Sequence, residues 1–272
     1  MKIIKKWATQ LAKATSFIGH EKEGILRLAV LISGKGTNLL ALAEAINQKD
    51  FPAEIRVVVV EDLTLCKYTL EELKKYSKNE IIIKELKYNH VALKKNSRAY
   101  WSMLQEILIA QDVEMICLAG FMHLIPERFI KAWTKYGSDR CLATTRNWKH
   151  VPAIINIHPS LLPSFKGLNA VGQALDAGTK FTGCTIHFVD SGMDSGPIIA
   201  QGIVPIKKRD TVATLTERIQ KAEHYYYKQI IKLIAEDKIS FTDGGKVVLD
   251  DNLIHNFNIS YPAKITQLNI EV

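Results

Sequence analysis

The residues best suited to chemistry lie where one apolar run ends. The isoleucines that start at Ile154 favour a buried parallel strand, and Pro159 prevents that strand from continuing. Asn156 and His158 are alternate residues at the carboxyl end of this strand, so they point to the same side. Ligands bind at this edge of open α/β sheets. An amide donor and an imidazole would therefore face one cleft, although a histidine in such a place can also be a hydrogen-bonded structural residue.

A glycine loop follows the first predicted strand. The apolar segment Leu26 to Ile32 leads into Ser-Gly-Lys-Gly-Thr-Asn at 33–38, and a helical pattern follows from Leu39. Backbone N–H groups at such a helix start suit a phosphate or carboxylate. Leu39 stands where a dinucleotide fingerprint has its third glycine, and the P-loop ending is absent, so neither a nicotinamide cofactor nor ATP is supported. The alternative is a tight turn in which Asn38 only caps the helix.

A third polar segment is the turn Asp190 to Pro197. It joins two predicted strands, 182–189 and 198–205, and contains two aspartates and two glycines. Asp194 would lie at the edge of a loop. An aspartate in this setting is usually a turn former that bonds its own backbone, so this segment alone does not establish a catalytic carboxylate.

The elements that must position these residues alternate between strand and helix. This alternation predicts right-handed crossovers and a Rossmann-like α/β fold, with an open, mostly parallel sheet and helices on both faces. Strands are expected at 26–32, 55–60, 81–86, 115–118, from 154, and at 182–189 and 198–205. Helices are expected at 39–46, 70–76, 97–111 with Ser97 as cap, 126–136, 169–177, and 211–235 with Thr211 as N-cap. A small hairpin is expected at 238–249.

The chain of 272 residues divides into one central domain with additions. Residues 25–249 form the predicted domain, and 137–153 are a predicted surface insertion. Residues 1–24 have apolar side chains at helical spacing among lysines, which predicts an amphipathic extension that docks on the body or on a partner. An organelle presequence or a helix on a membrane surface is the alternative. The tail, 250–272, carries no usable motif.

Composition excludes several classes of protein. Hydrophobic residues make up 47% and charged residues 24%, and no apolar run approaches the ~20 residues of a membrane helix. The four cysteines are widely spaced, so they predict neither a zinc site nor a disulfide framework, and a reducing cytoplasm is expected. The net charge of +8 comes from scattered lysines without an arginine-rich stripe. We interpret it as a composition bias together with anionic small substrates, and we expect no nucleic-acid partner.

These segments together resemble the 10-formyltetrahydrofolate-dependent formyltransferase family. The resemblance extends over roughly 26 to 237 and is carried by motifs in the family's order. The motifs are Ile32–Leu39, Leu118–Met122, Asn156–Pro163, His187–Asp190 with Asp194–Pro197, and Gln220 with Glu223 and His224.

The resemblance implies a role for each matching residue. The implied catalytic set is Asn156, His158 and Asp194. The implied substrate-binding residues are Gly36, Thr37, Asn38, Pro159, Gln220 and Glu223. The implied folate-binding residues are Arg98, Met122, His123, Leu124, Ile125, Asn156, Asp190, Ser191, Gly192, Met193 and Asp194. The family also implies a cis peptide bond at Leu162–Pro163. No metal ion is expected to be required.

The implied reaction transfers a formyl group from 10-formyltetrahydrofolate to the amine of phosphoribosylglycinamide in purine biosynthesis. Attack on the formyl carbon would place negative charge on an oxygen, which Asn156 and a protonated His158 beside Asp194 would stabilise. A monomer or homodimer acting on small molecules is expected. The alternatives are a formyltetrahydrofolate deformylase, whose family members carry a preceding regulatory domain, and a non-catalytic protein that binds an anionic metabolite. Three positions depart from the family pattern, namely His123, Asn169 and Val171.

Overall fold

The computed structural model describes residues 24–76, 80–87, 90–133, 153–241 and 246–249, and the side chains of 90–97 are not described. The predicted extension and tail therefore lie outside the described residues, apart from Gly24. The predicted insertion also lies outside them, apart from Ala153.

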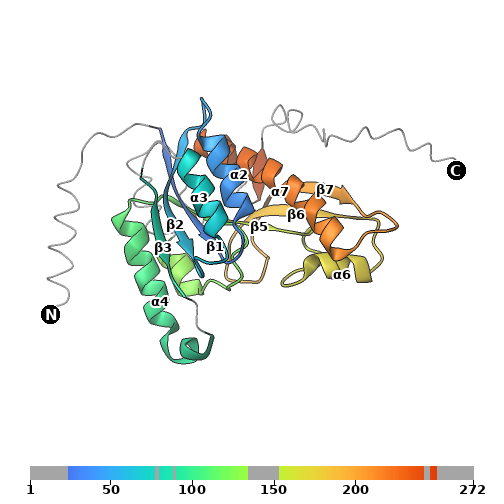
Figure 1. The fold of residues 1–272 in the computed structure, drawn as a ribbon, viewed down its shortest axis with the longest axis horizontal. Helices are drawn as coiled ribbons and strands as arrows, with labels where there is room; N and C mark the ends of the chain where they lie inside the picture. The colour runs from blue at the N-terminus through green and yellow to red at the C-terminus, as the bar shows by residue number, and fades with distance from the viewer. Residues whose placement is uncertain (1–23, 77–79, 88–89, 134–152, 242–245, 250–272) are drawn as a thin grey trace, which may run out of the picture.

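A seven-stranded sheet forms the centre of the molecule, in the order β3-β2-β1-β4-β5-β6-β7 (Figure 1). Its strands are β1 Leu26–Ile32, β2 Ala53–Val60, β3 Ile82–Glu85, β4 Met115–Leu118, β5 Ile154–His158, β6 Phe181–Phe188 and β7 Ile198–Pro205. The first five strands pair in parallel, whereas β6 and β7 run antiparallel to their neighbours. The predicted fold class, a mostly parallel open sheet, is confirmed.

The chain reverses its direction of travel across the sheet at β1. The strands β2 and β3 lie on one side of β1, and β4 lies on the other. This point is a topological switch, and the carboxyl ends of the strands on either side of it form the usual ligand crevice. Three hydrogen bonds join β1 and its loop to the loop that leaves β4. Ala119 N donates to the Leu31 carbonyl at 3.0 Å, Ser33 N to the Gly120 carbonyl at 3.3 Å, and Met122 N to Ser33 Oγ at 3.1 Å.

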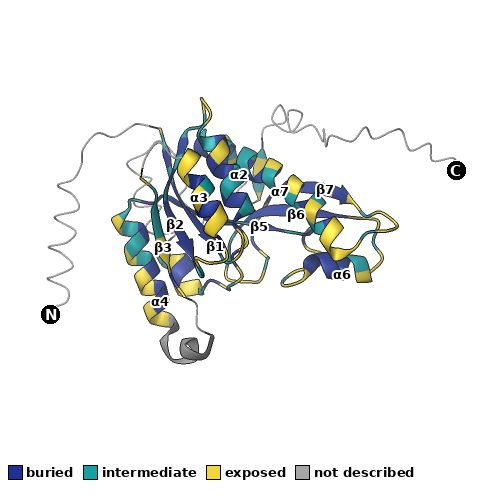
Figure 2. Ribbon diagram, viewed as in Figure 1, coloured by how far each residue is buried: buried dark blue, intermediate teal, exposed yellow. Residues whose placement is uncertain are grey.

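Helices cover both faces of the sheet. The helices are α2 Thr37–Ile46, α3 Lys67–Tyr76, α4 His90–Ala110, α6 Ala170–Asp176 and α7 Val212–Ala235, and residues 127–133 are also helical. Core residues of α2, α3 and α7 join Leu28, Val30 and Ile32 of β1, whereas those of α4 join Ala29 and Leu31. The alternation along β1 sends successive side chains to opposite faces, and Figure 2 shows the matching buried and exposed stripes on the helices.

The long helix α7 begins as the sequence predicts. Thr211 is its N-cap, and its hydroxyl accepts a hydrogen bond from Thr214 N while the Thr214 side chain bonds the N-cap backbone. The carboxylate of the preceding Asp210 is paired with Arg218, which also donates to the Pro205 carbonyl at 3.0 Å. The hydrogen bond from Arg218 is the main cause that lowers the pKa of Asp210 below its ordinary value. These contacts attach the start of α7 to the end of β7.

One predicted helix start is wrong. The helix α4 begins at His90, so Ser97 is an interior position and does not cap the helix. No glycine or proline lies between these two residues to stop the helix from extending toward its amino terminus. The predicted hairpin is confirmed by the antiparallel pair β8 Ile239–Phe241 and β9 Val247–Leu249, whose turn lies outside the described residues.

Candidate active site

The strand β5 places Asn156 and His158 at the carboxyl edge of the sheet. Asn156 is half-buried and His158 is buried, and both belong to the last residues of the strand. The antiparallel partner β6 puts His187 opposite Asn156 and Thr185 opposite His158. The two side chains predicted to share a cleft therefore lie against the same stretch of β6.

Both ring nitrogens of His158 face oxygen atoms. Nε2 lies 2.9 Å from the Phe165 carbonyl, and Nδ1 lies 3.4 Å from Oδ2 of Asp194. Because a carbonyl oxygen only accepts hydrogen bonds, Nε2 carries a hydrogen. Nδ1 then faces the carboxylate, and a second hydrogen there makes a cation that satisfies both oxygens. This geometry suits a charged donor at the site.

Asp194 is held in place by its own backbone conformation and by a bond from Gly167. Its backbone is left-handed, with φ 46°, a conformation that Asp and Asn tolerate better than most residues. Its Oδ2 accepts a hydrogen bond from Gly167 N at 2.8 Å. Asp190 folds the same loop, since its Oδ1 accepts from Gly192 N at 3.1 Å and from Ser195 Oγ at 2.7 Å. Asp190 is thus a turn former here, whereas Asp194 reaches the histidine.

His187 is a site residue to which the sequence assigned no role. Its Nδ1 donates to the Phe188 carbonyl at 2.8 Å, so in the neutral ring Nε2 is free to accept from Asn156 Nδ2 at 3.2 Å. Burial lowers the pKa of His187, which favours this neutral ring, and Nε2 also lies 3.7 Å from Asp194 Oδ1. His187 therefore fixes which end of the Asn156 amide carries the hydrogens. Its position on an apolar strand was the available signal, but its pairing with Asn156 depends on the register of β6.

The glycine loop after β1 leads directly into α2. Gly36 has φ 73°, a left-handed backbone that favours glycine, and a Cβ there would lie 2.9 Å from Ile32 Cδ1, which would have to shift. The helix begins at Thr37, which leaves its first N–H groups for a ligand. Thr69 of α3, which the sequence did not single out, donates its hydroxyl to the Lys35 carbonyl at 2.5 Å and holds the loop.

Asn38 joins this loop to the long helix. Its Nδ2 donates to Oε2 of Glu223 at 2.9 Å, and its side chain does not cap α2, whose N-cap is Gly36. Burial raises the pKa of Glu223. Within the described residues Asn38 Oδ1 is a buried acceptor without a hydrogen-bond partner. Gln220 lies three positions earlier on α7 and is half-buried, so it is on the same side of the helix as Glu223.

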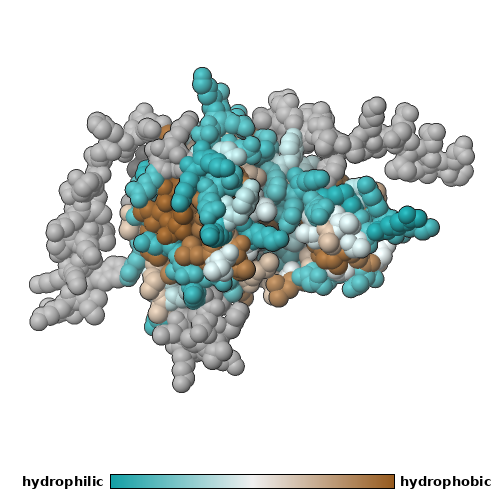
Figure 3. All heavy atoms as spheres, viewed as in Figure 1, coloured by the Kyte–Doolittle hydropathy of each residue, from teal (hydrophilic) through white to brown (hydrophobic). Residues whose placement is uncertain are grey.

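The predicted folate residues divide into exposed side chains and buried ones. Met122, Leu124 and Met193 are exposed apolar side chains, whereas Ile125 is buried. Leu168, also exposed, belongs to the loop beside Met193, since a Cβ on the neighbouring Gly167 would lie 2.9 Å from the Met193 sulfur. Figure 3 shows apolar patches on the otherwise hydrophilic surface, one of them near α6. Arg98 is exposed on α4.

The departures from the family pattern have structural explanations. The side chain of His123 is only 6% exposed and forms an ion pair with Glu61 at the end of β2. It also packs edge-on against Phe121, with ring centroids 5.2 Å apart. Only its main chain is thus presented to a ligand. Asn169 takes the left-handed N-cap position of α6, and Val171 is buried in the core. The Leu162–Pro163 peptide bond is cis, as expected.

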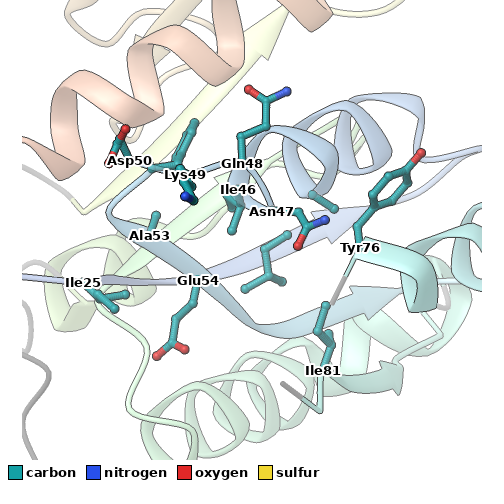
Figure 4. A pocket seen from close by; sticks show the side chains of 13 residues that line it. Ile25, Ile46, Asn47, Gln48, Lys49, Asp50, Ala53, Glu54, Tyr76 and Ile81 are labelled. Atoms are coloured by element: carbon teal, nitrogen blue, oxygen red, sulfur yellow. The ribbon is translucent and has the colours of Figure 1, made fainter. Parts of the chain in front are cut away.

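A separate pocket of about 330 Å³ lies at the other end of the sheet (Figure 4). It is lined by the start of β1 and β2 and by the end of α2, including Ile25, Ile46, Asn47 and Ala53. These are the amino ends of the parallel strands, and the candidate site is at their carboxyl ends. In the described part of the chain no cluster of histidine, cysteine or carboxylate side chains is arranged to hold a metal ion. None of the described helices is long and apolar enough to span a membrane.

Comparison with known proteins identifies the protein family. The family model described as formyl transferase matches residues 26–137 and 143–231. Its interruption falls inside the predicted insertion. This chain belongs to the formyl transferase family, as the resemblance predicted.

Individual relatives with known names indicate a particular kind of formyl transferase. The phosphoribosylglycinamide formyltransferase of Bacillus subtilis (strain 168) is 36% identical over 206 residues, which are 76% of this chain and 93% of that protein. A crystal structure of phosphoribosylglycinamide formyltransferase from Anaplasma phagocytophilum is 39% identical with a TM-score of 0.66, and the match covers 83% of this chain and 94% of that one. The trifunctional purine biosynthetic protein adenosine-3 of Bos taurus is 38% identical over 221 residues, 81% of this chain. The chain spans only 19% of the length of that trifunctional relative.

Proposed function

We propose that this chain transfers a formyl group from 10-formyltetrahydrofolate to the amine of phosphoribosylglycinamide, a step of purine biosynthesis. The observation that carries the proposal is the convergence of an amide, an imidazole and a carboxylate. Asn156 and His158 come from β5, and Asp194 comes from the β6–β7 loop, 3.4 Å from the histidine ring. The names of the relatives that match most of their own length support the same reaction.

The reaction needs a hydrogen-bond donor beside the formyl oxygen, where negative charge develops. The amine attacks the formyl carbon, and the carbonyl π electrons move to the formyl oxygen, which becomes an oxyanion in a tetrahedral intermediate. Asn156 Nδ2, oriented by His187, is the hydrogen-bond donor for that oxygen, and the His158 ring beside it adds positive charge. The amine loses a proton to Asp194, through water. The intermediate collapses as the bond to N10 of the folate breaks, and N10 takes up a proton.

The acceptor substrate is placed on the other side of the crevice. The N–H groups of Gly36, Thr37 and Asn38 at the start of α2 suit a phosphate dianion. Glu223 and Gln220 on α7 provide polar groups for the ribose and the glycinamide, and Pro159 shapes the floor next to His158. An orphaned acceptor on Asn38 supports the presence of a polar ligand there.

The folate lies against the loops that leave β4 and β6. The main chain of 122–125 offers hydrogen bonds to the pterin ring, since the side chain of His123 is occupied by Glu61. The apolar side chains of Met122, Leu124 and Met193 cover the flat rings, together with the loop 190–194. Arg98 provides a cation for the glutamate carboxylates. We further propose a cytoplasmic enzyme that acts as a monomer or homodimer on these small molecules, without a metal ion.

Hydrolysis of the formyl donor is the competing function. A deformylase uses water as the acceptor and has no use for a phosphate loop or for polar groups on α7. A non-catalytic binding protein would keep the loop without needing the amide, imidazole and carboxylate together. Positioning of a second substrate contributes ~7–11 kcal/mol toward a barrier, so the acceptor should govern the rate.

The test is to follow the absorbance change of 10-formyltetrahydrofolate with purified protein, with and without phosphoribosylglycinamide. We expect slow loss of the donor alone and fast loss when the ribotide is added. Fast loss that ignores the ribotide would favour the hydrolase. No turnover in either case would favour a binding protein.

A further inference from the structure

The carbonyl of Phe165 has a special place beside His158. It accepts the hydrogen bond from Nε2 at 2.9 Å, on the side of the ring opposite Asp194. Phe165 itself has φ 56°, a left-handed conformation that is rare for a bulky residue. A backbone in this conformation persists only where surrounding contacts fix it. The contacts that fix Phe165 therefore control one of the two hydrogen-bond partners of the histidine.

Ser160 makes those contacts from a fully buried position. Its hydroxyl donates to the Ser164 carbonyl at 2.6 Å and lies 3.3 Å from the Phe165 carbonyl. Its backbone N–H donates to the His158 carbonyl at 2.9 Å. Ser160 is thus bonded both to the residue that carries the imidazole and to the end of the loop that presents the carbonyl.

Two further side chains fasten the loop from β6 and β7. Thr185 Oγ1 donates to the Ser160 carbonyl at 2.6 Å and accepts from Leu162 N at 3.0 Å. Gln201 Nε2 lies 3.0 Å from Thr185 Oγ1 and 2.9 Å from the Leu162 carbonyl. The Thr185 hydroxyl thereby uses its one donor and both of its acceptor sites. Thr185 and Gln201 thus hold the segment from Ser160 to Phe165 through bonds that do not involve the reacting groups.

The ring of His158 lies between two competing acceptors. Asp194 attracts a hydrogen onto Nδ1, and the Phe165 carbonyl attracts a hydrogen onto Nε2. If the carbonyl moved away, the cation would lose the acceptor of its Nε2 hydrogen, and the ring would favour a single hydrogen on Nδ1, against the carboxylate. We propose that Ser160 is a positioning residue that keeps a hydrogen on Nε2 of His158 by holding the Phe165 carbonyl against it. The effect on turnover rests on the proposed formyl transfer, but the position of the hydrogen does not.

The test uses ¹⁵N-histidine NMR spectra of the full chain at neutral pH, with His158 assigned from its absence in a His158→Gln variant. In the wild type we expect Nε2 of His158 to give the signal of a protonated nitrogen. In Ser160→Ala we expect that signal to move toward the value of an unprotonated nitrogen. Thr179→Val is the matched control, because Thr179 also donates a side-chain hydroxyl to a backbone carbonyl, that of Ala174 at 3.2 Å, away from the site. It should leave the His158 signals unchanged.

Kinetics give the second measurement. Loss of one hydrogen bond changes an equilibrium by about 2- to 10-fold, so Ser160→Ala should lower kcat by up to about tenfold and leave both KM values nearly unchanged. If Ser160→Ala does not fold, the same spectra of Gln201→Met test the proposal, because Gln201 is exposed on the edge strand β7 and can be replaced without disturbing the core. Gln201→Met should shift the Nε2 signal of His158 in the same direction but by less. A folded Ser160→Ala or Gln201→Met whose His158 spectrum matches the wild type overturns the proposal. A shifted spectrum in a protein without formyl transfer would instead overturn the proposed function alone.

Discussion

Replacing Asp194 by asparagine removes one negative charge and almost no volume. Asp194 Oδ2 accepts a hydrogen bond from Gly167 N at 2.8 Å, and the amide oxygen of the new side chain can accept the same bond. Asparagine also tolerates the left-handed backbone, φ 46°, of this position. The loop should therefore keep its shape. The change isolates the charge beside His158.

The size of the effect follows from the distance between the two groups. At the 3.4 Å that separates His158 Nδ1 from Asp194 Oδ2, two unit charges attract by about 5 kcal/mol at an effective dielectric constant of ~20. Asp194 is the carboxylate in ion-pair range of His158, and its side chain is mostly buried, so little of this attraction is screened. Loss of one oxyanion donor typically lowers kcat by about 10²–10³. We expect Asp194→Asn to lower kcat by roughly a thousandfold.

The assay measures kcat, both KM values and a thermal melt on the same preparation. The expected result is a wild-type melting temperature, KM values within about threefold of wild type, and the large loss in kcat. Asp190→Asn is the control, because it changes the same loop but not the contact with His158. A folded Asp194→Asn enzyme that retains turnover within about tenfold of wild type would refute the role given to the carboxylate.

The remaining predictions concern the substrate side, the long helix and the folate loop. Gly36→Ala adds a Cβ to a left-handed backbone, 2.9 Å from the side chain of Ile32. The variant should raise KM for the ribotide far more than KM for the folate. Equal increases in the two KM values would count against a phosphate-binding role of this loop. Because burial raises the pKa of Glu223, the unfolded chain loses this proton first as pH rises, and the stability of the native chain falls above about pH 4.5. Glu223→Gln keeps an acceptor for Asn38, so melts at about pH 5 and about pH 8 should show a higher melting temperature than wild type mainly at the higher pH, and a lower one at that pH would contradict this. Glu61→Gln weakens the pairing with His123, so it should raise KM for the folate a few-fold with little change in kcat; a rise in KM for the ribotide instead would show that the pair serves the other substrate.

Local patterns in the sequence predict most of the fold. Buried parallel strands appear as continuous apolar runs, and Gly36 marks the turn before α2 because its φ of 73° favours glycine. Thr211 was predictable as an N-cap because its hydroxyl bonds within its own helix. The start of α4 was not predictable, because Ser97 is a residue type that often caps helices but no glycine or proline precedes it to end the helix there. A capping residue in the sequence predicts a helix start only where the residues before it cannot be helical.

Contacts between distant segments explain what the sequence did not predict at the site. His187 meets Asn156 only through the antiparallel register of β6, and β6 and β7 shift register between Ile186 and His187. Thr69 reaches the glycine loop from another helix, and Glu61 meets His123 from the end of β2. None of these pairs is close in sequence, so no spacing rule brings them together. By contrast, Asn156 and His158 share one strand, and their common direction follows from the strand period alone.

The most direct test of the account follows the formyl carbon itself. The wild-type chain is given 10-formyltetrahydrofolate labelled with ¹³C in the formyl group, together with phosphoribosylglycinamide, and the products are separated by mass spectrometry. We predict that nearly all of the label released from the donor is found in formylated ribotide, one label for each tetrahydrofolate formed. Label that accumulates as formate at the same rate with and without the ribotide would contradict it.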